Sequence, residues 1–296
     1  MGVGAVKVDL PNLSRSLEDR GPFSVEPLKP GSRSKRRALE VWNRRRVRFG
    51  LKAARDWNHA PILSEEIGKL EKNAIHTLGL VLAPSRSSGV ANACAWSTPG
   101  CEPPFCLSGA GNNAYGRNAL VRAARTAFLF ECPATFWRAV GTELAAAIRK
   151  HGTVAARLNV LSDIRHELVC PDLGRWPGLV LIDYTKAPPR ARSTAAANGW
   201  RLVHSITERH TVAQVDELLA VVPVAVVVNR SSSIKTRSSV NGSPLRNVRR
   251  VVDGDRNDER WLDRPGDLVV LKKKGKMPKL GGLTRGDLFS SLSNDA

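Results

Sequence analysis

The amino-acid sequence predicts an α/β protein whose mostly parallel strands form a (β/α) barrel or part of one, with a doubly wound open sheet as the runner-up. Short apolar runs recur along the chain, and they are continuously apolar rather than alternating, as in strands buried on both faces. Helix-length segments separate these runs, which is the pattern of parallel strands joined by crossover helices. Polar residues follow each run, as at the carboxyl ends of barrel strands, where ligands bind.

Composition divides the chain into three parts. Residues 1–57 are expected to form an irregular lead-in and a basic helical arm, residues 58–280 an α/β domain that carries the chemistry, and residues 281–296 a flexible tail. Residues 1–32 are rich in Pro, Ser and Gly without a periodic pattern. Between Arg33 and Arg55 the apolar spacing allows a helix, in which ten basic residues stand against one acid, Glu40.

The first half of the α/β domain is predicted to be mainly helical. Apolar residues within 62–77 have helical spacing, so a helix is expected there. Residues 78–83 are short and apolar, as in a buried strand. Residues 94–106 are rich in Pro and Gly and form a stiff loop, because proline removes a backbone donor and fixes φ. Helices follow over residues 115–130 and 136–151.

The second half is predicted to alternate between strands and helices. Thr211 is placed to cap a helix over residues 211–220. Residues 231–250 are rich in Ser and Arg and are expected to form a mobile loop. Strands are expected over residues 154–161, 179–185, 201–206, 224–229, 251–255 and 267–275.

The net charge of +19 indicates a polyanionic partner, and nucleic acid is the simplest one, DNA rather than RNA. The alternative is a generally basic composition in which arginine replaces lysine. In the basic helical arm, dense arginine with few acids is the usual footprint of phosphate contact, although a solvated basic helix would look the same. The residues predicted to bind nucleic acid are Arg36, Arg37, Arg44, Arg45, Arg46 and Arg48.

The sequence also favours a soluble, cytoplasmic protein. The first residues lack the sustained apolar stretch of a signal peptide. The longest apolar run, residues 218–228, contains Pro223 and is too short to span a bilayer. Five cysteines, three of them clustered, argue against a disulfide framework and for a reducing compartment.

Three of the cysteines, Cys94, Cys101 and Cys106, are spaced C-x6-C-x4-C in the loop after the first predicted strand. Three thiolates held close together suit zinc or an iron–sulfur cluster. Their place after the first strand resembles that in radical-SAM enzymes, which would imply S-adenosylmethionine as cofactor, but both intervals differ from the usual C-x3-C-x2-C. The alternative is that all three are unligated structural cysteines.

Further polar residues follow the later strands, and the carboxyl ends of parallel strands meet at one edge of the sheet. These residues form the candidate catalytic set, which would face the cysteines around one mouth. Structural ion pairs and a simple turn at Asp253-Gly-Asp255 are the alternatives. A magnesium-dependent nuclease would use Asp163, Asp183 and Asp253. The candidate catalytic residues are Asp163, Arg165, Asp183, Tyr184, Lys186, Asp253 and Asp255.

Four blocks in order, over roughly residues 78–280, resemble a phage- and plasmid-borne family whose members are described as rolling-circle-replication-associated or of unknown function. They are the cysteine loop with its following helix, RLNVLSDIRHE, LVLIDYTKAPPR, and VVDGDRNDERWLDRPGDLVVLKKKGK. The chain departs from the family pattern at Trp261, where Phe is expected, and by one extra residue between the last two loop cysteines. The resemblance marks Cys94, Cys101, Cys106, Arg125, Asn159, Asp163, Arg165, Asp183, Tyr184, Lys186, Asp253, Asp255 and Asp258.

The resemblance implies a mobile-element protein of the bacterial host cytoplasm that is associated with replication. The nicking chemistry of rolling-circle initiators is not expected, because the sequence has no pair of histidines flanking one hydrophobic residue. The leading hypothesis is a protein acting on or with nucleic acid, with a cysteine-lined metal or iron–sulfur site and possible enzymatic activity there. The alternative is a non-enzymatic nucleic-acid-binding accessory protein with structural cysteines or zinc. Reaction, substrate and oligomeric state stay open.

Overall fold

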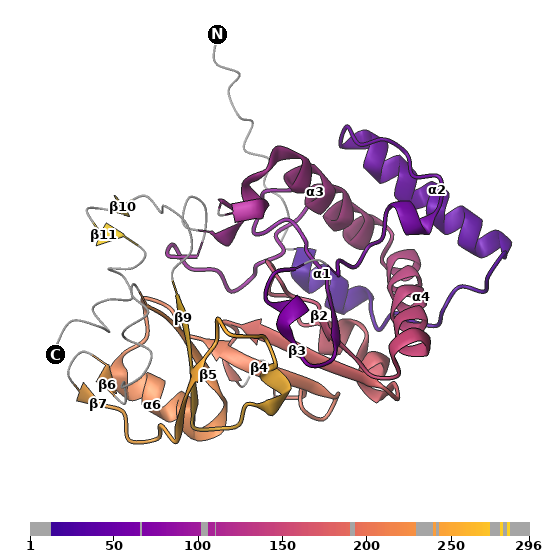
Figure 1. The fold of residues 1–296 in the computed structure, drawn as a ribbon. Coiled ribbons are helices and arrows are strands. Elements are labelled where there is room, and N and C mark those ends of the chain that lie inside the picture. The colour runs from indigo at the N-terminus through magenta and orange to yellow at the C-terminus, as the bar shows by residue number, and fades with distance from the viewer. Residues whose placement is uncertain are drawn as a thin grey trace, which may run out of the picture.

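A seven-stranded, entirely parallel sheet organises the computed structural model of the chain (Figure 1). The structure describes residues 13–65, 67–101, 106–109, 111–189, 193–228, 239–240, 243–272, 279–280 and 283–284. The strand order is β1-β2-β3-β4-β5-β9-β8, and neighbouring strands pair in parallel throughout. The strands are β1 (His76–Gly79), β2 (Val154–Arg157), β3 (Leu179–Thr185), β4 (Trp200–Ser205), β5 (Val224–Val228), β8 (Arg250–Asp253) and β9 (Asp267–Lys272).

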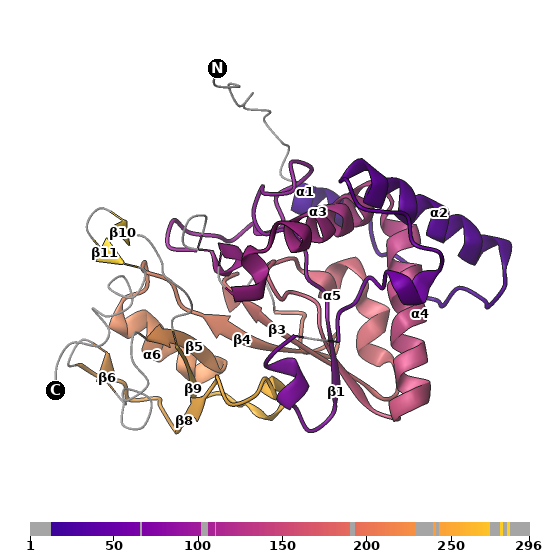
Figure 2. The same ribbon diagram turned by 45° about the horizontal axis from the view of Figure 1, so that its top comes forward.

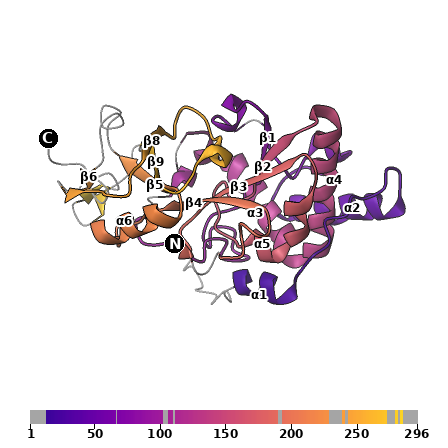
Figure 3. The same ribbon diagram turned by 90° about the horizontal axis from the view of Figure 1, so that it is seen from below.

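The strand order is that of a half-barrel. The first five strands lie side by side in chain order, and the sheet curls, as the view from below in Figure 3 shows. In a doubly wound sheet the first strand would instead lie inside the sheet, with later strands on both sides of it. Because β1 forms one open edge and β8 the other, the barrel does not close. The prediction of an α/β fold with a partial barrel is confirmed.

The crossover helices cover one face of the sheet. In Figure 2, α3, α4 and α5 lie over β1–β3. Farther along the sheet, Val224, Val226 and Val228 of β5 cluster with Val215 and Leu219 of α6. Outside this layer, α1 contacts α5, and α2 packs on α3 and α4. The helices are α1 (Leu13–Arg20), α2 (Arg33–Arg48), α3 (Gly116–Glu131), α4 (Pro133–His151), α5 (His166–Val169) and α6 (Val212–Val221).

Two short hairpins lie outside the main sheet. One consists of β6 (Ser239–Val240) and β7 (Ser243–Pro244), and the other of β10 (Lys279–Leu280) and β11 (Leu283–Thr284). Half of the predicted loop over residues 231–250 and most of the predicted tail after residue 280 lie outside the described residues.

The main core lies between the sheet and the helices. Its largest fully buried side chains include Trp42, Trp137, Trp200, Phe128 and Phe136. Because side chains alternate along a strand, the other face of the sheet carries a second, smaller cluster, in which Tyr184 packs with valines and an alanine. We call this second surface the inner face.

The predicted helix over residues 62–77 is wrong. Ser64 pairs with Gly79 in an antiparallel bridge, a short 3-10 turn spans Leu70–Lys72, and β1 begins at His76. The backbone N–H groups of Ile62 and Leu63 donate to the Glu143 carboxylate at 2.9 and 2.8 Å, so a long-range contact fixes an extended backbone here.

The N-terminal residues join the same core. Within the predicted irregular lead-in the chain forms α1, whose Leu17 is fully buried, and Trp42 of α2 is buried against Phe128. The division into three domains stays a prediction. Among the described residues, no helix combines the length and the apolar character needed to cross a membrane.

Candidate functional site

The cysteine-rich loop lies across the carboxyl edge of the sheet, the edge at which the parallel strands end. Cys94 forms a parallel bridge with Asp163, which follows β2, and the Asp163 N–H donates to Ala93 O at 2.8 Å. Farther along the loop, the Thr98 hydroxyl donates to the Glu208 carboxylate, after β4, at 2.9 Å. The loop after the first strand is therefore held by the loops after the second and fourth strands.

The side chain of Cys94 is buried, and its S–H group is hydrogen-bonded as a neutral thiol. Its sulfur accepts a hydrogen bond from Ser85 N–H at 3.1 Å, and its S–H donates to Leu161 O at 3.4 Å. Burial raises the pKa of Cys94 to about 12, and the neighbouring charges of Cys101, Asp163 and Cys106 act in the same direction. A neutral, hydrogen-bonded thiol fits this environment better than a thiolate does.

The other two loop cysteines lie in the same region as Cys94. Cys106 is buried, with its sulfur accepting from Ser108 N–H at 3.5 Å, and Cys101 is half-buried. In the part of the chain that the structure describes, no three His, Cys, Asp or Glu side chains lie close enough together to hold a metal ion. The zinc or iron–sulfur site, and with it S-adenosylmethionine, stays a prediction.

Asp163 connects three segments at the carboxyl edge. Its carboxylate accepts from the Thr185 hydroxyl at 2.8 Å and from Lys186 N–H at 2.7 Å, at the end of β3. With its own N–H bound to the cysteine loop, this buried residue ties that loop to β2 and β3. Among the predicted site residues, Cys94 and Lys186 are thus adjacent to Asp163, both through backbone contacts.

Asn159 and Asp183 form a second buried pair in the same region. Asp183 is fully buried, and its carboxylate accepts from Asn159 N–H at 2.6 Å and from the Asn159 side-chain amide at 3.1 Å. The side-chain oxygen of Asn159, Oδ1, in turn accepts from the Ser162 hydroxyl and from Ile164 N–H, both at 2.9 Å. The R-L-N-x-x-S-D element therefore folds as a turn built on one asparagine.

A separate cluster of charged groups lies on the inner face, around Asp258. The Tyr184 hydroxyl donates to Asp258 Oδ1 at 2.9 Å, and Arg157 Nη1 lies 2.8 Å from Oδ2. The Arg157 guanidinium also stacks over the Tyr184 ring, with its carbon 4.5 Å from the ring centroid. Lys69 donates to Gly254 O at 2.8 Å, and its nitrogen lies 3.8 Å from Asp258. Arg260 is a third nearby cation, 4.0 Å from Asp258.

The cluster around Asp258 shifts the ionisation of its members. Burial alone would raise the pKa of Asp258, but Arg157 and Lys69 hold it below its ordinary value. Burial lowers the pKa of Lys69, and burial together with the Asp258 charge raises the pKa of Tyr184 well above its usual range. The group is thus an ionised carboxylate enclosed by cations and a neutral phenol. Its role in holding residues 67–72 and 258–262 against the sheet follows from these contacts.

Three members of the candidate catalytic set belong neither to the contacts at the carboxyl edge nor to the cluster around Asp258. Arg165 points to α1, where its Nε donates to Glu18 at 2.8 Å. Asp253 is exposed, and it accepts from Asp255 N–H at 2.9 Å within a turn. Asp255 accepts from Lys272 N–H at 2.6 Å, at the end of β9. The structure therefore divides the predicted mouth into two clusters and an exposed turn.

His204, near the end of β4, is a buried neutral histidine. Burial lowers its pKa to about 4, and the charges of His210 and Lys186 act in the same direction. The rings of His204 and His210 meet edge to face with their centroids 5.5 Å apart. This environment favours a histidine without charge at neutral pH.

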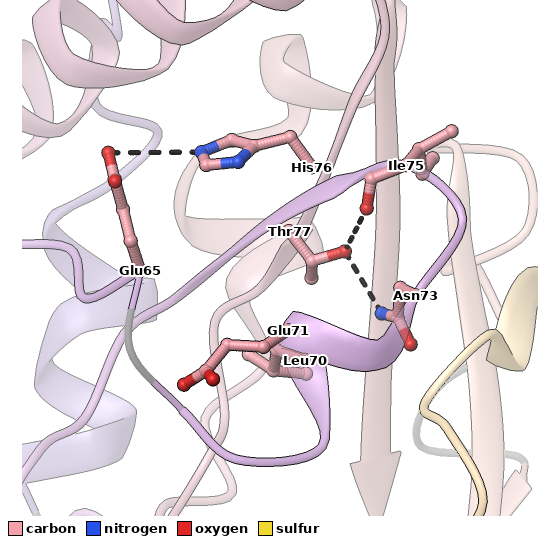
Figure 4. Close-up of a pocket in the computed structure, with 7 residues that line it drawn as sticks. All are labelled: Glu65, Leu70, Glu71, Asn73, Ile75, His76 and Thr77. Carbon is pink, nitrogen blue, oxygen red and sulfur yellow. Dashed lines mark hydrogen bonds and ion pairs between the residues drawn. The ribbon is translucent and has the colours of Figure 1, made fainter.

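A pocket of about 260 Å³ opens at the opposite, amino edge of the sheet, at the start of β1 (Figure 4). It is lined by Glu65, Leu70, Glu71, Asn73, Ile75, His76 and Thr77. None of these residues belongs to the predicted sites. His76 stacks on His151 with ring centroids 4.0 Å apart and lies 3.8 Å from Glu65. The pocket and the carboxyl-edge contacts are therefore different features.

The predicted nucleic-acid-binding arginines lie on α2, which Ser32 caps by accepting from Lys35 N–H at 3.1 Å. Arg45 and Arg48 contact Glu131 at the end of α3, at 3.1 and 2.7 Å. Arg46 is half-buried, with its guanidinium carbon 5.5 Å from the centre of the Trp42 ring. The exposed arginines of α2 are Arg33, Arg36, Arg37, Arg44 and Arg48.

A further cation, Arg117, extends this charge onto the first turn of α3. Arg117 is exposed, and its charge lowers the pKa of Arg46, after the larger effect of burial. Figures 1 and 2 both show α2 beside α3. We call the five exposed arginines of α2, with Arg46 and Arg117, the α2–α3 basic surface.

Sequence reasoning missed three cations of the inner face: Lys69, Arg157 and Arg260. Arg157 is the first residue of the block RLNVLSDIRHE, and Arg260 lies in the block VVDGDRNDERWLDRPGDLVVLKKKGK. Both blocks carry the family resemblance, so these two arginines lie in segments that the sequence marks. Nothing in the sequence marks Lys69 as part of a site, because a helix was expected over residues 62–77. Its contacts with Gly254 and Asp258 join residues that are far apart in sequence.

Comparison with protein families gives one match. Residues 54–286 match the family described as Gene product 88, a phage-type family. Comparison with curated proteins found no match, and comparison with solved structures found none. The match spans most of the chain, including every strand of the main sheet but not α1 and α2. The chain therefore belongs to the Gene product 88 family.

Proposed function

We propose that this Gene product 88 protein binds nucleic acid, DNA in preference to RNA, through the α2–α3 basic surface. The observation that carries the proposal is the exposed arginine of α2. Among the described residues, Arg48 is the one exposed arginine of this helix that has an acidic partner, Glu131. The one acid of α2, Glu40, is exposed and forms no ion pair among the described residues, so phosphate groups would supply the missing anions.

Helix stability does not account for these arginines. The first turn of α2 contains Arg33, Lys35 and Arg36 and no acid. The amino end of a helix carries a partial positive charge, so cations there are unfavourable by a few tenths of a kcal/mol each. A polyanion bound across the helix would remove this cost, which supports a role in binding.

The arginines of α2 and α3 also lie close enough to repel one another. Burial lowers the pKa of Arg125 to about 10, and the charges of Arg46 and Arg122 lower it further while Glu143 opposes them. Several guanidinium groups thus share one region with the half-buried carboxylate of Glu143. A phosphate chain bound beside the exposed Arg117 and the half-buried Arg46 would lower the repulsion between these two arginines.

For the cysteine loop at the carboxyl edge we propose a separate role, the binding of a metal or cluster. A zinc ion or iron–sulfur cluster held by the loop cysteines, and an association with replication, are parts of the hypothesis that rest on the resemblance and on the cysteine spacing. Nucleic-acid binding is the part that the exposed charge supports.

The experiment that tests the proposal is a binding measurement over a range of salt concentrations. A labelled DNA duplex, a DNA single strand and an RNA single strand are titrated with the protein. Phosphate neutralisation predicts that the logarithm of the binding constant falls linearly with the logarithm of salt concentration. No binding at low salt would overturn the proposal.

A further inference from the structure

The start of α3 exposes apolar side chains beside the α2–α3 basic surface. Tyr115, which precedes the first turn of α3, is 65% exposed. Leu120 on α3 and Leu107, shortly before it, are 41% and 38% exposed. These are three of the six large apolar side chains in the described part of the chain that are exposed, and they lie within fourteen residues of one another along the sequence.

Tyr115 has no structural task that would explain its exposure. It is the N-cap residue of α3, but its side chain makes no capping hydrogen bond. The second tyrosine, Tyr184, is buried and bonded to Asp258, as a structural tyrosine is expected to be. An exposed ring at a helix start is therefore available to a partner.

Arginines follow Tyr115 along α3, on the helix that packs beside α2. Arg117 is exposed two residues after Tyr115, and it lies near Arg46. Beneath them Arg122, which is 5% exposed, donates to Asn113 O at 3.0 Å, while its Nε has no hydrogen-bond partner. The combination is an aromatic ring next to a positively charged track.

We propose that Tyr115 is a stacking platform for an unpaired base, and that single-stranded nucleic acid is the preferred ligand of the α2–α3 basic surface. The inference rests on the proposed function and names its substrate class. Bases stack on exposed aromatic rings when they are not paired, while the phosphates follow neighbouring cations. A duplex hides the faces of its bases, so it gains the phosphate contacts of Arg117 and α2 but not the contact with Tyr115.

The test compares Tyr115→Ala, Tyr115→Phe and Arg117→Ala with the wild-type chain, with an oligo-dT strand and a duplex of the same length as probes. Stacking predicts that Tyr115→Ala weakens single-strand binding about 10-fold, that Tyr115→Phe retains it, and that duplex binding changes less than about 2-fold. Arg117→Ala should weaken binding to both probes. Leu262→Ala, which shortens another exposed apolar side chain away from α3, is the control and should change neither.

The outcomes separate the two proposals. Equal single-strand affinity for Tyr115→Ala and wild type would overturn the stacking platform, while salt-dependent binding that Arg117→Ala weakens would leave the proposed function standing. Failure of the wild-type chain to bind either probe would overturn both. Circular dichroism of each variant shows whether it is folded, and Tyr115→Leu, which keeps an apolar side chain but removes the ring, repeats the test if the alanine variant is not.

Discussion

At the scale of single residues, short polar side chains build the carboxyl edge. Asp163 binds the cysteine loop, Thr185 and Lys186 at once, and Asn159 joins its own turn to Asp183. Buried polar groups of this kind cost free energy unless each is paired, and here the pairs are made with backbone N–H groups and with short polar side chains. The residues that the resemblance marks thus include several whose visible task is to hold loops in place.

The cysteine loop leads to a prediction about thiol reactivity. Because the pKa of Cys94 is about 12 rather than 9, its thiolate fraction at pH 8 should be about a thousandfold smaller than that of an ordinary cysteine. Iodoacetamide labelling followed by peptide mass spectrometry should modify the half-buried Cys101 well before Cys94. Equally rapid labelling would contradict the buried thiol. Labelling of Cys94 that rises after a chelator is added would instead show a bound metal.

The inner face leads to a prediction about stability. Asp258→Asn should lower the free energy of unfolding by about 3–5 kcal/mol, because it replaces a fully buried carboxylate and leaves the half-buried Arg157 and Lys69 beside a neutral group. Asp172→Asn is the matched control, since its partner Arg175 lies 3.8 Å away and both side chains are exposed, and it should cost less than about 1 kcal/mol. Urea unfolding measures both values. Similar losses of unfolding free energy in the two variants would show that the cluster around Asp258 does not hold its segments against the sheet. Tyr184→Phe, with an expected cost of about 1 kcal/mol, serves if Asp258→Asn does not fold.

At the scale of elements, strands were predicted better than the segments that close over them. Residues 179–185 match β3, and Thr211 caps α6 by accepting from Gln214 N–H, because both follow from local sequence. The segment 62–77 failed because Glu143, far along the chain, binds its backbone. The same reason explains the site: loops at the ends of parallel strands could be predicted to meet, whereas the inner-face cations depend on contacts between distant residues.

The half-buried Glu143 and the buried His204 give opposite pH dependences. Burial raises the pKa of Glu143 from 4.5 to about 7, so its contribution to stability is present below pH 4.5 and is lost as pH rises toward 7. Burial lowers the pKa of His204 from 6.5 to about 4, so its contribution is present above pH 6.5 and is lost as pH falls toward 4. The two effects should largely cancel between pH 4.5 and 6.5.

Single variants should separate these two effects. Relative to wild type, Glu143→Gln should make the free energy of unfolding rise more steeply with pH in that window, by up to about 1.4 kcal/mol per pH unit. His204→Gln should change the slope by a similar amount in the other direction. Urea unfolding at several pH values measures the slopes. If the slope of the unfolding free energy against pH is unchanged in both variants, neither the pKa of Glu143 nor that of His204 is shifted as the structure indicates.

At the scale of the whole molecule, burial makes the surface more basic than the net charge of +19 suggests. Among the described residues, five carboxylates but only three arginines are buried, so more negative than positive groups are removed from the surface. Acids are used inside, in the contacts of Asp163, Asp183 and Asp258, while arginines of α2 face outward. Composition alone predicted the excess of charge, but its concentration on α2 and the start of α3 required the fold.

The measurement that tests the central claim most directly is the salt dependence of DNA binding in two variants of equal charge. Arg36→Gln, Arg37→Gln and Arg44→Gln together remove three exposed charges from α2. Arg149→Gln, Lys150→Gln and Arg175→Gln remove three exposed charges from segments that precede β2 and β3 at the amino edge. We expect the α2 variant to bind a DNA duplex more weakly, with a salt slope smaller by roughly 2 to 3, and the amino-edge variant to keep the wild-type slope. Equal slopes for the two variants would contradict the assignment of binding to α2.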